Sequence, residues 1–292
     1  MNTAALIILA LKASVFLNVF ALGLNASPRD ATYLLRNPKR LAQALSSMFV
    51  VMPLFAAALA SAFDLHPAVK LALITLAVAP IPPLLPKKAM KAGGESSYAI
   101  GLLVAAALLS IVFTPLAVDL LGKWFGTPAQ ISPLAIARLV LLTVIVPLGA
   151  GMLVRRVAPA FAERGQSPIA LAATALLIAS VIPILFTAWP AIESLTGNGT
   201  VFAIAAFVLV GLAAGHLLGG PDPEDRTVQA LYTASRHPGI AMAIASANFP
   251  EVKLTPAAIL LYLIVSAIIS MPYLDWRKRR HVGTVGGAPA PS

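Results

Sequence analysis

The sequence contains no cysteine, and charged residues make up only 11% of its 292 residues. Without cysteine the chain has no disulfide, no thiolate metal site and no cysteine nucleophile. Soluble domains carry about 25% charged residues, so this composition excludes an ordinary soluble domain. Apolar residues are abundant instead, at 59% of the chain, with a mean hydropathy of +0.88. The sequence therefore predicts an integral membrane protein.

The apolar residues form long continuous runs and do not alternate with polar residues, which predicts helices and not a membrane barrel. At about 20 residues per span, the chain has room for about nine spans in a single transmembrane domain over residues 1–281. The Gly/Pro/Ala/Ser-rich segment 282–292 is predicted to be a disordered tail. The predicted spans are 5–24, 39–62, 67–92, 96–121, 131–154, 168–188, 199–219, 226–249 and 254–274.

Acidic residues are also scarce, with 11 Asp and Glu against 21 Lys and Arg. In a soluble protein this excess would point to nucleic acid, but in a membrane protein basic residues in short loops set the orientation, and we expect no nucleic-acid partner. Alternate connections and the C-terminal segment carry thirteen Lys and Arg, whereas the other connections carry only Lys123 and Lys253. This bias predicts a cytoplasmic C-terminus and, with nine spans, an N-terminus outside. No Arg/Ser-rich transit segment is present, which favours a bacterial plasma (inner) membrane.

Two of the predicted spans are interrupted. The third contains Ala79-Pro-Ile-Pro-Pro-Leu-Leu-Pro-Lys-Lys88, and the eighth contains Thr233-Ala-Ser-Arg-His-Pro-Gly-Ile240. Interior prolines remove helical hydrogen bonds, and broken backbone is tolerated in a bilayer only where protein or a water-filled cavity satisfies it. Two breaks in corresponding halves of a chain indicate the binding site of an inverted-repeat transporter. We assign the repeats to about 1–125 and 130–281, and predict a secondary transporter whose substrate binds where the broken helices cross.

Both breaks carry positive charge, from Arg236 in one and from Lys87 and Lys88 in the other. A charge at membrane depth costs at least about 2.5–3.5 kcal/mol, and the nearby acidic residues fall in predicted loops, so a bound anion is the expected partner. The N–H groups that begin the second half-helix also suit a carboxylate. Alternatively, these cations reach the inner surface or cap the preceding half-helix. The predicted substrate-binding residues are Pro80, Pro82, Pro83, Lys87, Lys88, Thr233, Ser235, Arg236, His237 and Gly239.

Several segments resemble the bile acid:sodium symporter family. They are Gly23-Leu24 with Pro28 and Asp30, Asn37-Pro38-Lys39, Met52-Pro53, the stretch from Ala79 to Glu95, and the stretch from Gln229 to Phe249. The resemblance implies ten spans in two inverted five-span repeats, with a core of crossing broken helices and a panel domain. This sequence looks as though it lacks the first of those spans. The substrates implied are carboxylates, including bile-acid-like organic anions.

The family's sodium ligands are replaced in this sequence. The resemblance places a glutamate, a glutamine and an asparagine at the positions of Tyr232, Arg236 and His237, and a serine-asparagine pair at about Leu85-Pro86. Hard cations need oxygen ligands, so we expect no cofactor and transport without sodium, with Arg236 and Lys87 in place of the bound ions. His237 could link transport to protons, because histidine titrates near neutrality. The expected partners are a small organic anion and membrane lipid.

Three other functions compete with an organic-anion carrier. A cation/proton antiporter of the same architecture would need an Asp or Glu at the break, where the sequence has none. A membrane-embedded enzyme would need paired carboxylates, a metal cluster or a serine with a base, but the 4 histidines are scattered. A sensor would bind ligand without flux. The residues favour a transporter and not an enzyme.

Overall fold

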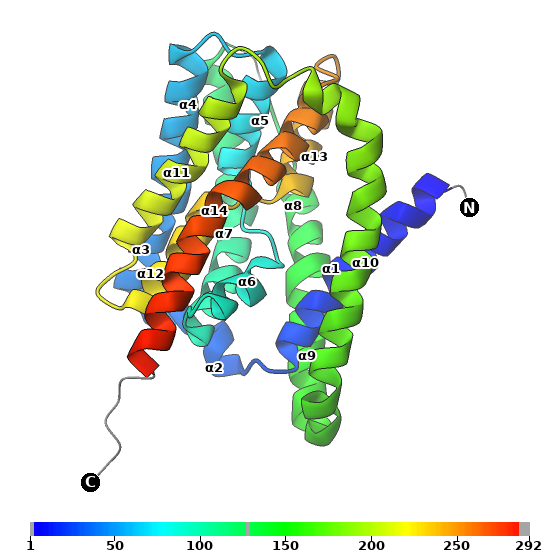
Figure 1. Cartoon of the computed structure of the whole chain (residues 1–292), viewed down its shortest axis with the longest axis vertical. Helices are drawn as coiled ribbons and strands as arrows, with labels where there is room; N and C mark the ends of the chain where they lie inside the picture. Colours follow the sequence, from blue (N-terminus) through cyan, green and yellow to red (C-terminus); the bar gives the residue numbers. More distant parts are fainter. Residues whose placement is uncertain (1–2, 127–128, 286–292) are drawn as a thin grey trace.

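The computed structural model describes residues 3–126 and 129–285, and the secondary structure of these residues is entirely helical (Figure 1). This confirms the predicted all-α membrane fold. The elements are α1 (Thr3–Gly23), α2 (Pro28–Ala31), η1 (Leu34–Arg36), α3 (Pro38–Leu45), η2 (Ser46–Val51), α4 (Met52–Ala62), α5 (Pro67–Val78), α6 (Leu85–Lys91), α7 (Ser96–Trp124), α8 (Pro133–Val140), η3 (Leu141–Ile145), α9 (Val146–Val157), α10 (Pro159–Glu193), α11 (Thr200–Leu218), α12 (Pro223–Ala234), α13 (Pro238–Asn248) and α14 (Thr255–Val285).

Seven helical segments of the described residues are long and apolar enough to cross a membrane. The other two predicted spans are the interrupted ones: α5 and α6 flank the first break, and α12 and α13 flank the second. The last four residues of α14 overlap the predicted tail 282–292, and residues 286–292 of that tail lie outside the described part of the chain.

Many of the prolines begin helices. A proline has no N–H to satisfy and its φ is already helical, so it fits the first helical position. The helices that begin in this way are α3, α5, α8, α10, α12 and α13, with Pro38, Pro67, Pro133, Pro159, Pro223 and Pro238.

Two spans contain a π-helical turn that was not predicted from the sequence. The turn η2 joins α3 to α4 and ends just before Pro53, and the turn η3 joins α8 to α9 and ends just before Pro147. A π-helical turn inserts extra backbone into an α-helix. Each span therefore stays continuous through its proline, in contrast to the two broken segments.

The helices form two groups, which agrees with the core and panel implied by the resemblance. The panel consists of α1, α8, η3, α9 and α10, in which α1 packs along both α9 and α10 (Figure 1). The core consists of α3 to α7 and α11 to α14, with α5 in contact with α4, α13 and α14. Both broken segments belong to the core.

Small residues bring α11 close to the first half of the second broken segment. A Cβ added at Gly215 would lie 2.5 Å from the carbonyl oxygen of Gln229, and one at Gly211 would lie 2.7 Å from the Cα of Ala234. Such small-xxx-small spacing lets helix backbones approach closely in membranes, where van der Waals packing drives association. The position of α12 is thus fixed by α11 up to the residue that precedes the break.

Candidate functional site

The two breaks meet inside the core. Residue Ala79 follows α5 in an extended conformation, and Ser235 follows α12 in the same way. The backbone N–H of His237 donates to the carbonyl oxygen of Pro80 across a distance of 2.8 Å. The breaks therefore cross as predicted and satisfy part of each other's freed backbone.

Arg236 is completely buried at this crossing. Its side chain is 0% exposed, and Nη2 donates to the carbonyl oxygen of Met48, 2.8 Å away in the π-helical turn η2. Its Nε and Nη1 atoms are also buried and have no hydrogen-bond partner among the described residues. No carboxylate of the described residues lies within ion-pair distance of Arg236. A buried guanidinium with a single neutral acceptor still needs a negative charge nearby.

His237 begins the second half-helix. Its Nδ1 accepts from the backbone N–H of Ile240 at 3.4 Å, which caps α13, while Nε2 is buried without a partner among the described residues. The neighbouring Gly239 is exposed and Ser235 is half-buried. The N-terminal end of α13 therefore leaves one imidazole nitrogen free for a ligand.

The two cations predicted to act together have different surroundings. Lys87 lies on α6 but points out of the core to the panel helix α10, where Nζ donates to the carbonyl oxygen of Ala170 at 3.2 Å and to Oγ1 of Thr174 at 3.0 Å. Thr174 Oγ1 also lies 3.4 Å from Oδ1 of Asn18 on α1. Lys87 therefore marks the boundary between core and panel, whereas Arg236 is enclosed in the core.

The remaining predicted residues line the breaks in different ways. Pro80 and Pro83 are buried, and Pro82 and Lys88 are half-buried. Thr233 is buried and its hydroxyl lies 2.9 Å from Oγ of Ser47, so it faces η2 and not the crossing. Its hydroxyl already has a protein partner.

Ser47, the partner of Thr233, belongs to a buried polar network that was not predicted from the sequence. The side chain of Gln229 donates to Oγ of Ser47 at 3.1 Å and to the carbonyl oxygen of Gln43 at 3.1 Å, and it accepts from the hydroxyl of Tyr98. The network ties α12 to α3, η2 and α7. Its sequence signal was weak, since its members come from three segments that lie far apart in the chain. No group of three or more His, Asp or Glu in the described residues could hold a metal ion.

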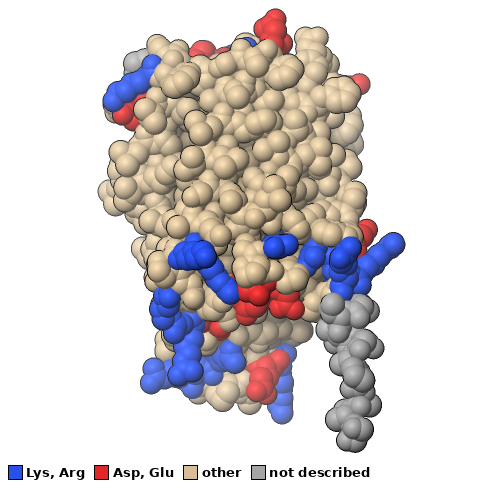
Figure 2. Space-filling view, turned by 90° about the vertical axis from the view of Figure 1, so that its left-hand side faces the viewer, with Lys and Arg blue, Asp and Glu red and all other residues tan. Residues whose placement is uncertain are grey.

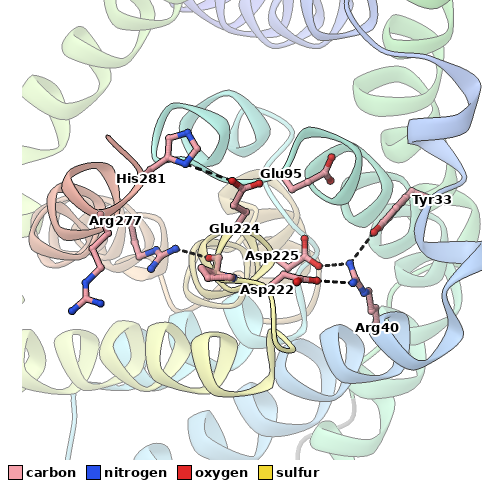
Figure 3. A pocket seen from close by; sticks show the side chains of 10 residues that line it. Tyr33, Arg40, Glu95, Asp222, Glu224, Asp225, Arg277 and His281 are labelled. Carbon is pink, nitrogen blue, oxygen red and sulfur yellow. Dashed lines mark hydrogen bonds and ion pairs between the residues drawn. The ribbon is translucent and has the colours of Figure 1, made fainter. Parts of the chain in front are cut away.

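A polar pocket of about 590 Å³ opens at the end of the core where α12 begins and α14 approaches its end (Figure 3). Arg40 joins its walls: it pairs with Asp222 at 2.6 Å, pairs with Asp225, and donates to the hydroxyl of Tyr33 at 2.8 Å. Asp225 is only 3% exposed. The sequence predicted a loop for the acidic residues near the second break, whereas Asp225 lies in the first turn of α12.

Burial raises the pKa of the Asp225 carboxyl to about 6, and the neighbouring Asp222, Glu95 and Glu224 act in the same direction, although Arg40 opposes the shift. On the opposite wall, Arg277 donates to the carbonyl oxygen of Pro223 and to Oγ1 of Thr227, both at 2.6 Å. The pocket therefore contains a carboxyl group that changes its protonation state close to neutral pH.

The model of the Sodium Bile acid symporter family matches residues 13–190. The "Uncharacterized sodium-dependent transporter YocS" of Bacillus subtilis (strain 168) is 26% identical over 261 residues, which cover 84% of this chain and 77% of that protein. The human and rat proteins named "Sodium/bile acid cotransporter 4" are each 26% identical over 224 residues, or 74% of this chain, and the match spans 50% of their length.

Proposed function

The chain belongs to the Sodium Bile acid symporter family and is a membrane transporter, not an enzyme, and from this premise we propose that it carries organic anions, in particular carboxylates, without sodium. The single observation that carries the proposal is Arg236. It holds a fully buried positive charge at the crossing of the breaks, with two guanidinium nitrogens that have no partner among the described residues. A substrate anion would supply the missing negative charge.

Two of the positions that carry sodium ligands in the family hold hydrogen-bond donors in this chain. Arg236 donates to the carbonyl oxygen of Met48, and the hydroxyl of Tyr232 donates to the carbonyl oxygen of Ala99 at 2.9 Å. Sodium is a hard cation and needs oxygen ligands, such as backbone carbonyl oxygens that are free of hydrogen bonds to the protein. In this chain, side-chain donors of the protein already bond to these carbonyl oxygens. This supports the proposal that the positive charge of Arg236 takes the place of a bound sodium ion.

Lys87 supplies the second cation of the proposed site. Its present partners, a backbone carbonyl and a hydroxyl, are neutral. A carboxylate forms stronger, charge-assisted hydrogen bonds with an ammonium group than neutral acceptors do. A substrate anion that enters between core and panel would therefore displace Ala170 and Thr174 from Lys87, and bind with its charge at the ammonium group.

The test is uptake of radiolabelled carboxylates and bile-acid-like anions into proteoliposomes that contain the purified chain. We expect equal uptake when choline replaces sodium, and a loss of at least about tenfold in Arg236→Met. Arg236→Met should remain folded, because removal of an unpaired buried charge relieves a desolvation cost. Strict sodium dependence would refute the coupling proposal. Unchanged uptake by a folded Arg236→Met would move the substrate site elsewhere, and ligand binding without flux would indicate a sensor.

We also propose a plasma (inner) membrane location with the C-terminus in the cytoplasm. Lys and Arg side chains gather at the lower end of the molecule in Figure 2, the end where α2, the junction of α9 with α10, and the last turns of α14 lie in Figure 1. Basic residues favour the cytoplasmic side of a membrane. A protease-sensitive tag after Ser292 should be protected in intact cells and cleaved after permeabilisation; cleavage in intact cells would reverse the orientation.

A further inference from the structure

A second cavity lies in the core, away from Arg236 and Lys87. This distal pocket, at the end of the core opposite the polar pocket, has a volume of about 340 Å³ and is lined by α4, α5, α7 and α13 and by segments that follow α7 and α13. Lys70 lies in its wall near the start of α5, and Val78 is the last residue of α5 before the first break. At a rise of 1.5 Å per residue, the pocket follows α5 for about 12 Å between these two residues.

Lys70 is the only charged side chain among the described residues that line the distal pocket. It is half-buried, and no carboxylate of the described residues lies within ion-pair distance of it. The hydroxyl of Thr75, the other polar side chain of the lining, already donates to the carbonyl oxygen of Leu71 at 2.8 Å. The remaining wall is apolar and includes Val118 and Ile244. The pocket is thus an apolar channel with one cation.

We propose that the distal pocket binds an amphiphile with one anionic head and one apolar chain, the head at Lys70 and the chain directed along α5 toward Val78. The described residues of the wall offer no partner for a second charge, whose burial without a partner would cost several kcal/mol. The volume lies near the lower end of the range for small-molecule sites, about 300–1,000 Å³, which favours a single chain over a two-chain lipid. The distal pocket contains none of the residues of the proposed transport site. This proposal therefore does not depend on the identity of the transported substrate.

Four probes with the same chain length separate the contributions of head and chain. Purified full-length protein in nonionic detergent is heated with decanoate, decanol, decylammonium or decanedioate, and its melting temperature is followed. We expect decanoate to stabilise the protein and the other three to have little effect, because they lack the charge, reverse it, or carry a second one into the apolar end. Equal stabilisation by decanol would show that Lys70 does not distinguish a carboxylate head from a neutral one, and would overturn the proposal.

Substitutions then locate the site. Lys70→Gln should weaken decanoate binding roughly tenfold, the usual contribution of a charged hydrogen bond, and Lys70→Arg should retain it. Lys123→Gln is the matched control, because Lys123 lies on α7 next to the lining residue Gly122 and pairs outside the pocket with Asp119 at 2.7 Å. Undiminished binding in Lys70→Gln, or equal loss in Lys123→Gln, would overturn the proposal.

Two further measurements test the shape of the pocket. Val118→Phe should fill the pocket and abolish decanoate binding without removing any charge, whereas Thr75→Val should bind normally because its hydroxyl is already bonded within α5. Phosphatidylglycerol in nanodiscs should not compete with decanoate. Competition by this two-chain lipid would assign the pocket to a lipid headgroup and refute a single-chain ligand, as would undiminished binding in Val118→Phe.

Discussion

At the scale of single residues, the buried groups Arg236 and Asp225 respond differently to pH. Arg236 stays protonated at any physiological pH, because the intrinsic pKa of a guanidinium lies far above neutrality. Asp225 differs, because its pKa is raised to about 6. The crossing of the breaks therefore keeps its charge when pH changes, whereas the polar pocket beside Arg40 does not.

Asp225 makes stability depend on pH in a direction that can be stated. The folded state binds the proton of Asp225 more tightly than the unfolded state, in which the pKa is near 3.8. This group therefore favours folding at low pH, and its contribution is lost as pH rises from about 4 to about 6. The rise of this pKa to about 6 corresponds to at most about 3 kcal/mol in the free energy of unfolding.

We predict that Asp225→Asn flattens the pH dependence of the melting temperature between pH 4 and pH 7. The wild-type protein should lose a few degrees more than the variant as pH rises over this interval. Asp222→Asn is the control, since it removes the other carboxylate on Arg40 but leaves Asp225 in place. Parallel curves for wild type and Asp225→Asn would contradict the prediction.

At the scale of elements, the sequence predicted the breaks and missed what holds them. The prolines from Pro80 to Pro86, and the pair Pro238-Gly239, predicted the ends of the half-helices because proline acts on its own turn. The acceptor of Arg236 could not be predicted in the same way. Met48 precedes Arg236 by 188 residues, and its carbonyl lies in a π-helical turn, a feature that no residue of Ser46–Val51 specifies alone.

The same limit applies to Lys87 and Thr233. Composition identifies both as polar groups in a broken apolar span, but not the direction of their side chains. Lys87 points to α10 and Thr233 to η2, because the neighbouring helices place acceptors there. Local chemistry therefore predicted which residues belong to the broken segments, and tertiary packing decided which of them face each other.

We predict that Gly215→Ala destabilises the protein through the contact between α11 and α12. The new methyl group would lie 2.5 Å from the carbonyl oxygen of Gln229, and overpacking of this kind typically costs about 1–3 kcal/mol. Gly149→Ala is the matched control, because a Cβ at this helical position meets nothing within 4 Å and alanine favours a helix. We expect thermal unfolding in detergent to show a lower melting temperature for Gly215→Ala and no decrease for Gly149→Ala. Equal melting temperatures for the two variants would show that the contact between α11 and α12 tolerates the added methyl group.

At the scale of the whole molecule, Lys87 connects the core to the panel. Its ammonium group bonds to α10, and through Thr174 it lies near Asn18 of α1, so residues from three separate spans meet at one point. Two of these three spans belong to the panel. A solute that passes between core and panel would encounter this cluster.

We predict that Lys87→Met raises the KM for organic-anion uptake about tenfold, as expected for the loss of one charge-assisted hydrogen bond. Lys91→Met is the matched control: it removes an equal charge from the exposed last residue of the same helix, which is not among the predicted substrate-binding residues. Measurement of initial uptake rates over a range of substrate concentrations separates the two variants. Equal effects would mean that only the net charge of α6 matters.

The π-helical turn η2 has a geometric consequence for the second span. Consecutive residues of an α-helix are offset by about 100° around its axis, and a π-helical turn adds one residue without advancing the helix by the usual step. Side chains after Val51 are thereby rotated by roughly that angle relative to an unbroken helical wheel that starts at Pro38. Deletion of one residue within Ser46–Val51 would turn the lipid-facing side of α4, including Leu54 with its 65% exposure, toward a different neighbour and displace the carbonyl that Arg236 uses.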